Sequence, residues 1–216
     1  MVVDFYPPIN LVAYKKFLLY NIDMSIIKVE KINSTNDFIK ENYTVLLEGD
    51  VVIAKSQSCG RGTHGRSFFS PEGGLYFSIL LKPTCADNVG YVTQIVAVAV
   101  TDAIREIFHI KTDVKYVNDI IYKGKKAGGI LCESDYLDGV YRYVVVGIGL
   151  NLSMPKGGYP EEIKSIATAL MESCTTEQAD SLCIKIRDLI LKYYYEADIK
   201  SVLAQYQERL IEIDYK

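Results

Sequence analysis

The sequence contains no tryptophan, only 2 histidines, and 5 cysteines without a single Cys-x-x-C pair. His64 and His109 are too few and too widely separated for a histidine-rich metal site. An odd number of unpaired cysteines is typical of reduced thiols in a cytoplasmic protein, and it argues against a disulfide framework or a zinc site. We therefore expect no metal site made by protein side chains alone.

The chain also lacks a long apolar run and an excess of positive charge. No apolar stretch approaches the roughly 18 residues that a membrane span needs. An Asp and a Pro pair interrupt the N-terminal residues where a secretory signal would be apolar. The net charge is −3, which gives no general electrostatic reason to bind nucleic acid. Neither a membrane nor a nucleic acid is therefore expected as a partner.

The length of 216 residues suits one globular domain with a small appendage. Residues 1–23 do not resemble the rest of the chain, and the pattern of a folded core begins near Met24. We predict an N-terminal appendage over residues 1–23 and one folded domain over residues 24–212.

The hydrophobic pattern predicts an α+β fold, in which flanking helices cover a mixed, largely antiparallel sheet. Ser34 and Asp37 stand at capping-box spacing where a first helix would begin. The expected strands are 26–32, 51–55, 75–83, 114–122, 128–135 and 140–152, with hairpin turns between the last three. The other expected helices are 87–108 and the bulk of 160–212.

Glycine and arginine gather in one stretch, "QSCGRGTHGRS", over residues 57–67. Its spacing is close to that of a nucleotide-hydrolase phosphate loop, with Arg66 in place of lysine. Such a loop must open a helix, but Pro71, Gly73 and Gly74 follow and prevent one. Glycines allow close backbone approach and arginines bind anions. A different anion-binding loop and a flexible surface turn both remain open here.

Two further stretches combine apolar strands with unusual residues. "VKYVNDIIYKGKKAGGILCE" places Lys115, Asn118 and Asp119 among apolar residues, and its pattern alone does not exclude a solvated strand end. "VVVGIGLNLS" places Gly147 and Gly149 inside an apolar strand. Glycine weakens a strand unless another group approaches the backbone closely. A dinucleotide-binding fingerprint is excluded, because no helix follows.

In this order, the three stretches resemble the motifs of the biotin–protein ligase family. The family pattern reads roughly G-R-G-R-x-G-R-x-W-x-S-P, K-W-P-N-D, G-[IG]-L-x-E and G-I-G-[IL]-N. Here it stands as "GRGTHGRSFFSP", "KYVNDI", "GGILCE" and "GIGLN", and "NSTND" matches the upstream helix start. The resemblance spans residues 26–152, and more loosely the helices beyond. It implies a catalytic domain related to lipoate–protein ligases and class II tRNA synthetases.

The resemblance also implies a two-step reaction. Biotin reacts with ATP, accompanied by Mg²⁺, to give biotinyl-5′-AMP and pyrophosphate. A lysine of the biotin carboxyl carrier domain of a biotin-dependent carboxylase then takes the biotinyl group and releases AMP. Two alternatives stay open: a lipoate or octanoate ligase or transferase, and a non-catalytic biotin-binding module.

The matching positions suggest roles for particular residues. The catalytic candidates are Lys115, Arg66 and Asp119. The biotin-binding candidates are Ser34, Thr35, Asn36, Gln57, Gly60, Arg61, Gly62, Thr63, Lys126, Gly129, Gly147 and Gly149. The ATP and adenylate candidates are Arg61, Arg66, Phe68, Asn118, Lys126 and Asn151.

The chain departs from the family pattern at several points. Thr63 replaces an arginine that helps close the loop over the adenylate, which predicts looser retention of biotinyl-AMP. Phe68 replaces a tryptophan, and Val117 replaces a proline. No helix-turn-helix domain is expected before residue 26, so the resemblance is to the monofunctional form of the family, and the family's small C-terminal β-barrel is expected to be absent. Family members dimerise in several ways, so a homodimer is compatible with the resemblance.

Overall fold

The computed structural model describes residues 2–4, 25–83 and 88–214. In this part of the chain, one eight-stranded sheet has the strand order β1-β2-β3-β4-β8-β7-β6-β5. The pairs β1–β2 and β2–β3 are parallel and the remaining pairs are antiparallel. The strands are β1 (Val2–Asp4), β2 (Ile26–Ile32), β3 (Val51–Gln57), β4 (Leu75–Leu81), β5 (Asp113–Lys115), β6 (Asp119–Tyr122), β7 (Lys125–Leu137) and β8 (Val140–Leu150).

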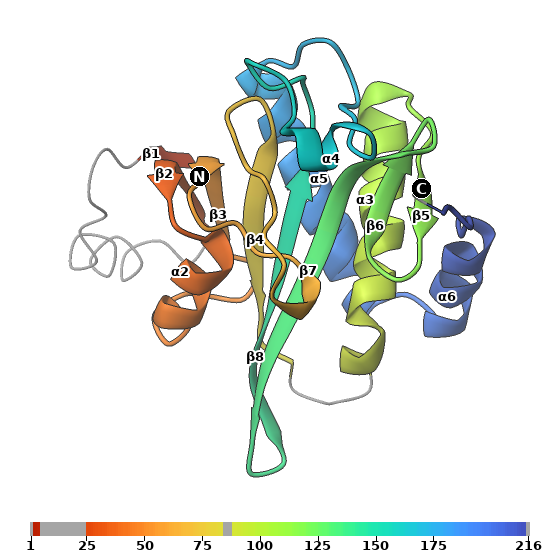
Figure 1. The fold of residues 1–216 in the computed structure, drawn as a ribbon. Helices are drawn as coiled ribbons and strands as arrows, with labels where there is room; N and C mark the ends of the chain where they lie inside the picture. The colour runs from red at the N-terminus through yellow and green to blue at the C-terminus, as the bar shows by residue number, and fades with distance from the viewer. Residues whose placement is uncertain (1, 5–24, 84–87, 215–216) are drawn as a thin grey trace.

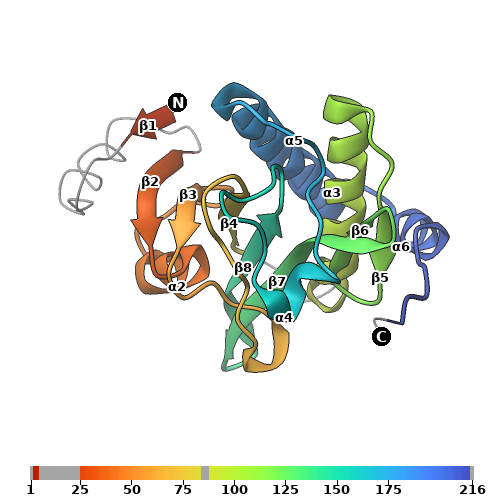
Figure 2. The ribbon, with the colours of Figure 1, turned by 45° about the horizontal axis from the view of Figure 1, so that its top comes forward.

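Helices cover both faces of this sheet, which confirms the predicted α+β class (Figures 1 and 2). On one face, α2 (Thr35–Asn42) packs against β3, β4 and β8. On the other face lie α3 (Val92–Phe108) and α5 (Thr176–Tyr195), with α6 (Ile199–Glu208) packed on α3. The described residues also contain three short helices: η1 (Thr63–Gly65), η2 (Val89–Tyr91) and α4 (Glu161–Lys164).

The central strand β4 is buried along its whole length. Successive side chains of a strand point to opposite faces. Phe77 and Ile79 therefore join the core beneath α3, while Leu80 joins the smaller core beneath α2. Helix α3 is buried on almost every side from Val92 to Ile104 because it lies between the sheet and the helices α5 and α6. A helix that is apolar all round requires such a buried place.

Most predicted elements are present with shifted ends. The predicted strand 51–55 extends to Gln57, and the strand 128–135 is part of the longer β7. The predicted helix 87–108 is regular only from Val92, after the short turn η2. Its first residue lies outside the described residues.

Two elements that were predicted as continuous are interrupted in the structure. The strand expected over 114–122 is a tight hairpin of β5 and β6, in which Lys115 pairs with Asp119. No Gly or Pro marks this reversal, so the hydrophobic pattern could not reveal it. The helical region expected over 160–212 is interrupted between α4 and α5. There the Lys126 carbonyl accepts a hydrogen bond from the Thr168 amide, and this segment lies along the start of β7.

The predicted appendage over residues 1–23 is described only at β1, which adds a parallel edge strand beside β2; the rest of it lies outside the described residues. The predicted division into an appendage and a domain over residues 24–212 therefore stays a prediction. Among the described helices, none combines the length and apolar character needed to cross a membrane.

Candidate active site

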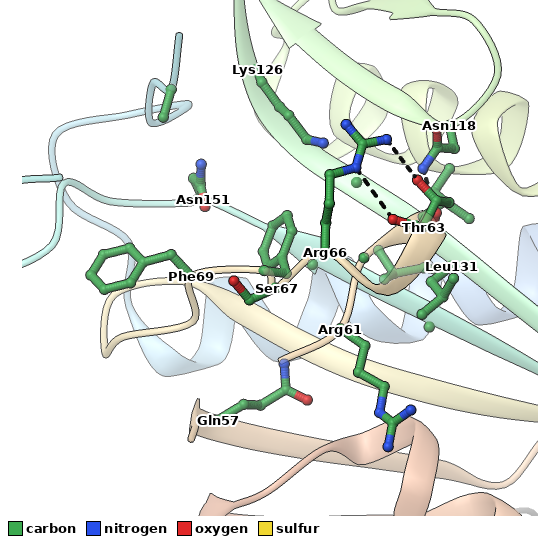
Figure 3. Close-up of a pocket in the computed structure, with 18 of the residues that line it drawn as sticks. Gln57, Arg61, Thr63, Arg66, Ser67, Phe69, Asn118, Lys126, Leu131 and Asn151 are labelled. Carbon is green, nitrogen blue, oxygen red and sulfur yellow. Dashed lines mark hydrogen bonds between the residues drawn. The ribbon is translucent and has the colours of Figure 1, made fainter. Parts of the chain in front are cut away.

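A cavity of about 230 Å³ opens on the α2 face of the sheet (Figure 3). Its walls come from the start of α2, the loop after β3, the first half of β7, the last residues of β8, and the segment that contains α4. It brings together most of the residues predicted from the sequence. Those that line it are Ser34, Thr35, Asn36, Gln57, Arg61, Gly62, Thr63, Arg66, Phe68, Asn118, Lys126, Gly129, Gly147, Gly149 and Asn151.

The predicted residues that do not line the cavity are Gly60, Lys115 and Asp119. Gly60 lies behind the wall, where an added Cβ would overlap the Phe68 carbonyl oxygen. Asp119 lies outside the lining, and its carboxylate pairs at 2.5 Å with the ammonium of the lining residue Lys126. Lys115 lies opposite Asp119 in the β5–β6 pairing.

One end of the cavity is a buried hydrogen-bonded network. The Thr35 amide and hydroxyl both donate to Gln57 Oε1, at 2.9 and 3.2 Å. Asn36 donates to Glu133 Oε2 at 2.8 Å. The Ser78 hydroxyl lies 2.7 Å from Thr35 Oγ1 and 2.5 Å from Asn36 Oδ1. Buried polar groups that are hydrogen-bonded in this way hold their side chains in one orientation.

The local sequence explains why these groups meet at this end. The Ser34 hydroxyl accepts from the Asp37 amide and so caps α2. This start of the helix directs Thr35 and Asn36 inward, and both side chains are buried. The predicted helix cap is therefore present. Asp37 itself pairs with Lys40 and Arg61.

Two glycines of β8 make room for the network and for one aromatic ring. An added Cβ on Gly147 would overlap the Asn36 side chain. On Gly149 it would lie 2.5 Å from the Phe68 ring. Glycine in a strand interior commonly marks such a close approach. Phe68 therefore packs directly on the sheet, and its ring forms part of the cavity wall.

The glycine-rich loop crosses over the sheet and returns to β4 without leading into an α-helix. The Gln57 amide donates to the Ser70 carbonyl, and the Phe68 amide donates to the Gly60 carbonyl. The loop is therefore a hairpin-like flap whose middle is the short helix η1. This arrangement agrees with the exclusion of a hydrolase phosphate loop.

Two arginines on this flap point to opposite sides of it (Figure 3). The Arg61 guanidinium reaches Asp37 on α2, with nitrogen–oxygen distances of 3.1 and 3.0 Å. Arg66 donates to the carbonyl and hydroxyl oxygens of Thr63, at 3.3 and 3.2 Å. Both arginines are exposed at the cavity mouth, so their planar forks can exchange these acceptors for a bound anion.

The end of the cavity opposite the polar network carries further cationic and amide groups. Lys126 Nζ lies 6.0 Å from the centre of the Phe68 ring. Asn118 donates to the Ile130 carbonyl at 2.9 Å, and Asn151 donates to the Thr168 carbonyl at 3.1 Å. These two amides fix the irregular segments against β7 and β8.

One wall of the cavity was not predicted from the sequence, and it contains Tyr159. The Tyr159 hydroxyl has no hydrogen-bond partner within the described part of the chain, and burial raises the pKa of this phenol to about 12. It therefore remains protonated, and its oxygen is buried within this wall rather than open to the cavity. The other unpredicted lining residues are Ser67, Phe69, Ile130, Leu131, Ile148, Ile163, Ile166 and Ala167. The apolar residues among them have the same sequence pattern as ordinary core residues.

The cavity therefore joins a polar end, an apolar middle and a cationic mouth. This arrangement suits a small organic acid whose polar head is buried and whose carboxylate lies next to a second anion. On a mixed sheet with flanking helices, such a cavity points to a domain of the synthetase-like fold class.

Comparison with known proteins specifies the class further. Residues 28–151 match the sequence model of the Biotin/lipoate A/B protein ligase family. The match covers more than half of the chain, so the chain belongs to this family. Its catalytic domains have the class II synthetase-like fold, as predicted.

Individual relatives support this assignment. The bifunctional ligase/repressor BirA of Bacillus subtilis is 39% identical over 128 residues, which are 58% of this chain and 39% of that protein. The Escherichia coli BirA is 32% identical over 150 residues, covering 68% of this chain and 46% of that protein. The chain thus spans less than half the length of these curated relatives.

Solved structures agree with the sequence matches. The biotin protein ligase from Aquifex aeolicus in complex with biotin and ATP superposes with a TM-score of 0.72 and 29% identity. That alignment covers 86% of this chain and 78% of the other. The apo structure of the same ligase gives a TM-score of 0.68.

Proposed function

We propose that this protein is an ATP-dependent biotin–protein ligase. It activates biotin to biotinyl-5′-AMP and transfers the biotinyl group to a lysine of a biotin carboxyl carrier domain. The observation that carries this proposal is a cavity that joins a buried hydrogen-bonded end to a cationic mouth. The names of the relatives favour biotin over lipoate as the acid.

The polar end of the cavity suits the cyclic urea of biotin, which both donates and accepts hydrogen bonds. Thr35 and Gln57 offer hydroxyl and amide groups there, and their mutual hydrogen bonds hold them in place. We place the aliphatic chain of biotin alongside the strand segment from Gly147 to Gly149, which lines the cavity. The carboxylate then points to the mouth, toward Arg66 and Lys126.

In the first step a biotin carboxylate oxygen attacks the α-phosphorus of ATP. The new oxygen–phosphorus bond forms as the bond to the bridging oxygen breaks, and pyrophosphate leaves with the electron pair. A carboxylate needs no general base. The protein's part is to align two anions and to neutralise their charge. We assign that role to Arg61, Arg66 and Lys126, with Asn118 and Asn151 beside the nucleotide.

Lys115 and Asp119 also receive roles in this proposal, although both lie outside the cavity lining. In the second step a neutral acceptor lysine attacks the acyl carbon, AMP leaves, and the amine loses a proton. Asp119 is our candidate to help accept that proton, and Lys115 remains our candidate for the carboxylate–phosphate junction. Both assignments rest on the motif, since neither residue lines the cavity.

Mg²⁺ enters this proposal as the companion of the ATP phosphates. Within the described residues, no three His, Cys, Asp or Glu side chains are grouped to hold a metal ion. The ion would therefore depend on phosphate oxygens and water for most of its ligands. Its chemistry would be to neutralise charge on the leaving pyrophosphate.

We further propose that residues 24–212 form the catalytic unit and that the protein works in the cytoplasm. Support for the compartment comes from the cysteines, since Cys59, Cys132, Cys174 and Cys183 are all free thiols. A homodimer stays a prediction of the family resemblance.

Incubation with ATP and a biotin carboxyl carrier domain tests the function. The acceptor should gain the mass of one biotinyl group when biotin is present, and none when lipoate or octanoate replaces it. Mass gain with lipoate or octanoate instead of biotin would identify the other ligase activity. Biotin binding without any mass gain would identify a non-catalytic binding module. Omission of ATP is the matched control.

A further inference from the structure

The C-terminal helix α6 is fastened to the rest of the protein at two places. Arg209, just after the helix, pairs with the buried carboxylate of Asp102 on α3 at 2.7 Å. The chain then continues beside β5. The Val114 amide donates to the Arg209 carbonyl at 2.8 Å, and the Ile211 amide donates to the Val114 carbonyl at 2.9 Å. Helix α6 is therefore held against both α3 and the β5–β6 hairpin.

One side chain of this helix reaches the tip of the hairpin. Tyr206 is only 1% exposed, and its hydroxyl donates to the Val117 carbonyl at 3.0 Å. Burial raises the pKa of Tyr206 to about 12. The phenol therefore stays protonated and remains a donor at neutral pH.

Val117 precedes Asn118, the amide residue at the cationic end of the cavity. Asn118 is held from the sheet side, because its side chain donates to the Ile130 carbonyl and its own carbonyl accepts from the Ile130 amide, both at 2.9 Å. The neighbouring Tyr116 is 75% exposed and gives the loop little packing of its own. The loop is thus fixed on one side by β7 and on the other side by Tyr206.

We propose that Tyr206 is a positioning residue for this loop. It lies outside the cavity and acts through the Val117 peptide, keeping Asn118 at the nucleotide end of the site. This proposal rests on the proposed function, because it assumes that the cationic end receives ATP. Its mechanical part, the restraint of the loop, is independent of any reaction.

Amide hydrogen exchange tests the mechanical part in the full chain. The Ile130 amide is the reporter, since its acceptor is the Asn118 carbonyl. In Tyr206→Phe this amide should exchange about three- to tenfold faster, the range expected for loss of one hydrogen bond. The control is Tyr193→Phe, which removes a 3.0 Å hydrogen bond to Asp102 on the same side of the sheet. It should leave Ile130 exchange within twofold of the unmodified protein.

Steady-state adenylation, followed as pyrophosphate release, tests the functional part. Tyr206→Phe should raise KM for ATP about three- to tenfold and change KM for biotin less than twofold. Tyr193→Phe should change neither constant beyond twofold. Equal Ile130 exchange in Tyr206→Phe and the unmodified protein, or a KM increase shared by both substrates, would overturn the proposal. If the unmodified protein released no pyrophosphate, the proposed function would fail, and the exchange experiment would still decide the role of Tyr206.

Discussion

Thr63 binds the Arg66 side chain within the flap, although it stands where the family pattern has an arginine. Its carbonyl and hydroxyl oxygens together accept two hydrogen bonds from Arg66. This pairing holds the Arg66 guanidinium against the loop's own backbone. The substitution therefore removes one cation and also provides an acceptor that competes with an anion for the remaining one.

Thr63→Arg should therefore lengthen the lifetime of enzyme-bound biotinyl-AMP. The new guanidinium adds a charged donor, and Arg66 loses its local hydroxyl acceptor. A hydrogen bond to a charged group contributes about 1.5–3 kcal/mol, so the release rate should fall about tenfold or more. Rapid filtration of preformed complex measures the rate. Thr63→Ser keeps the hydroxyl and serves as control; equal release rates for Arg and Thr at this position would contradict the idea.

Gly149→Ala should impair the cavity by displacing Phe68. The added Cβ would lie 2.5 Å from that ring, and overpacking of a tight site costs about 1–3 kcal/mol. We expect kcat/KM for biotin to fall about ten- to a hundredfold, on the same principle. Gly90→Ala is the matched control, because its Cβ would meet nothing within 4 Å. Unchanged kinetics in Gly149→Ala would mean that the ring is free to move elsewhere.

At the scale of elements, the start of α2 and strand β4 form one rigid unit. Ser78 of β4 is fully buried and lies between Thr35 and Asn36. A hydroxyl in this place links the helix to the centre of the sheet. The polar end of the cavity is therefore built on regular elements, while the cationic mouth is built on loops.

Ser78→Ala should lower both stability and biotin affinity. Removing the hydroxyl takes away the single O–H that lies between the buried oxygen atoms of Thr35 and Asn36, and a buried acceptor left without a donor costs about 1–3 kcal/mol. Denaturant unfolding and biotin titration by calorimetry measure the two effects. Ser58→Ala is the control, since its 2.8 Å hydrogen bond to Asn33 is exposed. Full affinity in Ser78→Ala would show that the network does not orient the ligand groups.

The sequence predicted those elements whose signal is local. Strand β4 and helix α3 follow from unbroken apolar patterns, and the start of α2 follows from its Ser34 cap. The β5–β6 reversal was missed because side chains far along the chain fix it: Asn118 bonds to Ile130, and Tyr206 bonds to Val117. Tertiary contacts of this kind leave no periodic mark in a single sequence.

In the candidate site, too, the residues in local motifs were predicted and those placed by tertiary contacts were missed. Motif positions brought most of the predicted residues to one cavity, because the motifs lie on adjacent strands and the flap above them. The wall that contains Tyr159 was not predicted. Its segment is short and irregular, and it reaches the cavity only because Lys126 and Asn151 hold the following residues against β7 and β8.

At the scale of the whole molecule, the cavity draws its walls from segments between Ser34 and Ala167. A ligand that bridges these segments binds the folded state and not the unfolded chain. Mass action then stabilises the fold by about 2.7 kcal/mol at a ligand concentration of 100 Kd. For a chain of this length, each kcal/mol shifts Tm by about 2–4 °C.

Biotin together with MgATP should therefore raise Tm by about 5–10 °C at saturating concentrations. The two ligands combined should exceed the sum of the single shifts, because biotinyl-AMP spans both ends of the cavity. Differential scanning calorimetry provides the measurement, with lipoate plus MgATP as the ligand control and Gly149→Ala as the protein control. Additive shifts would indicate that the two ends bind independently, and absent shifts would indicate that neither ligand binds. A shift with lipoate equal to that with biotin would contradict the assigned specificity.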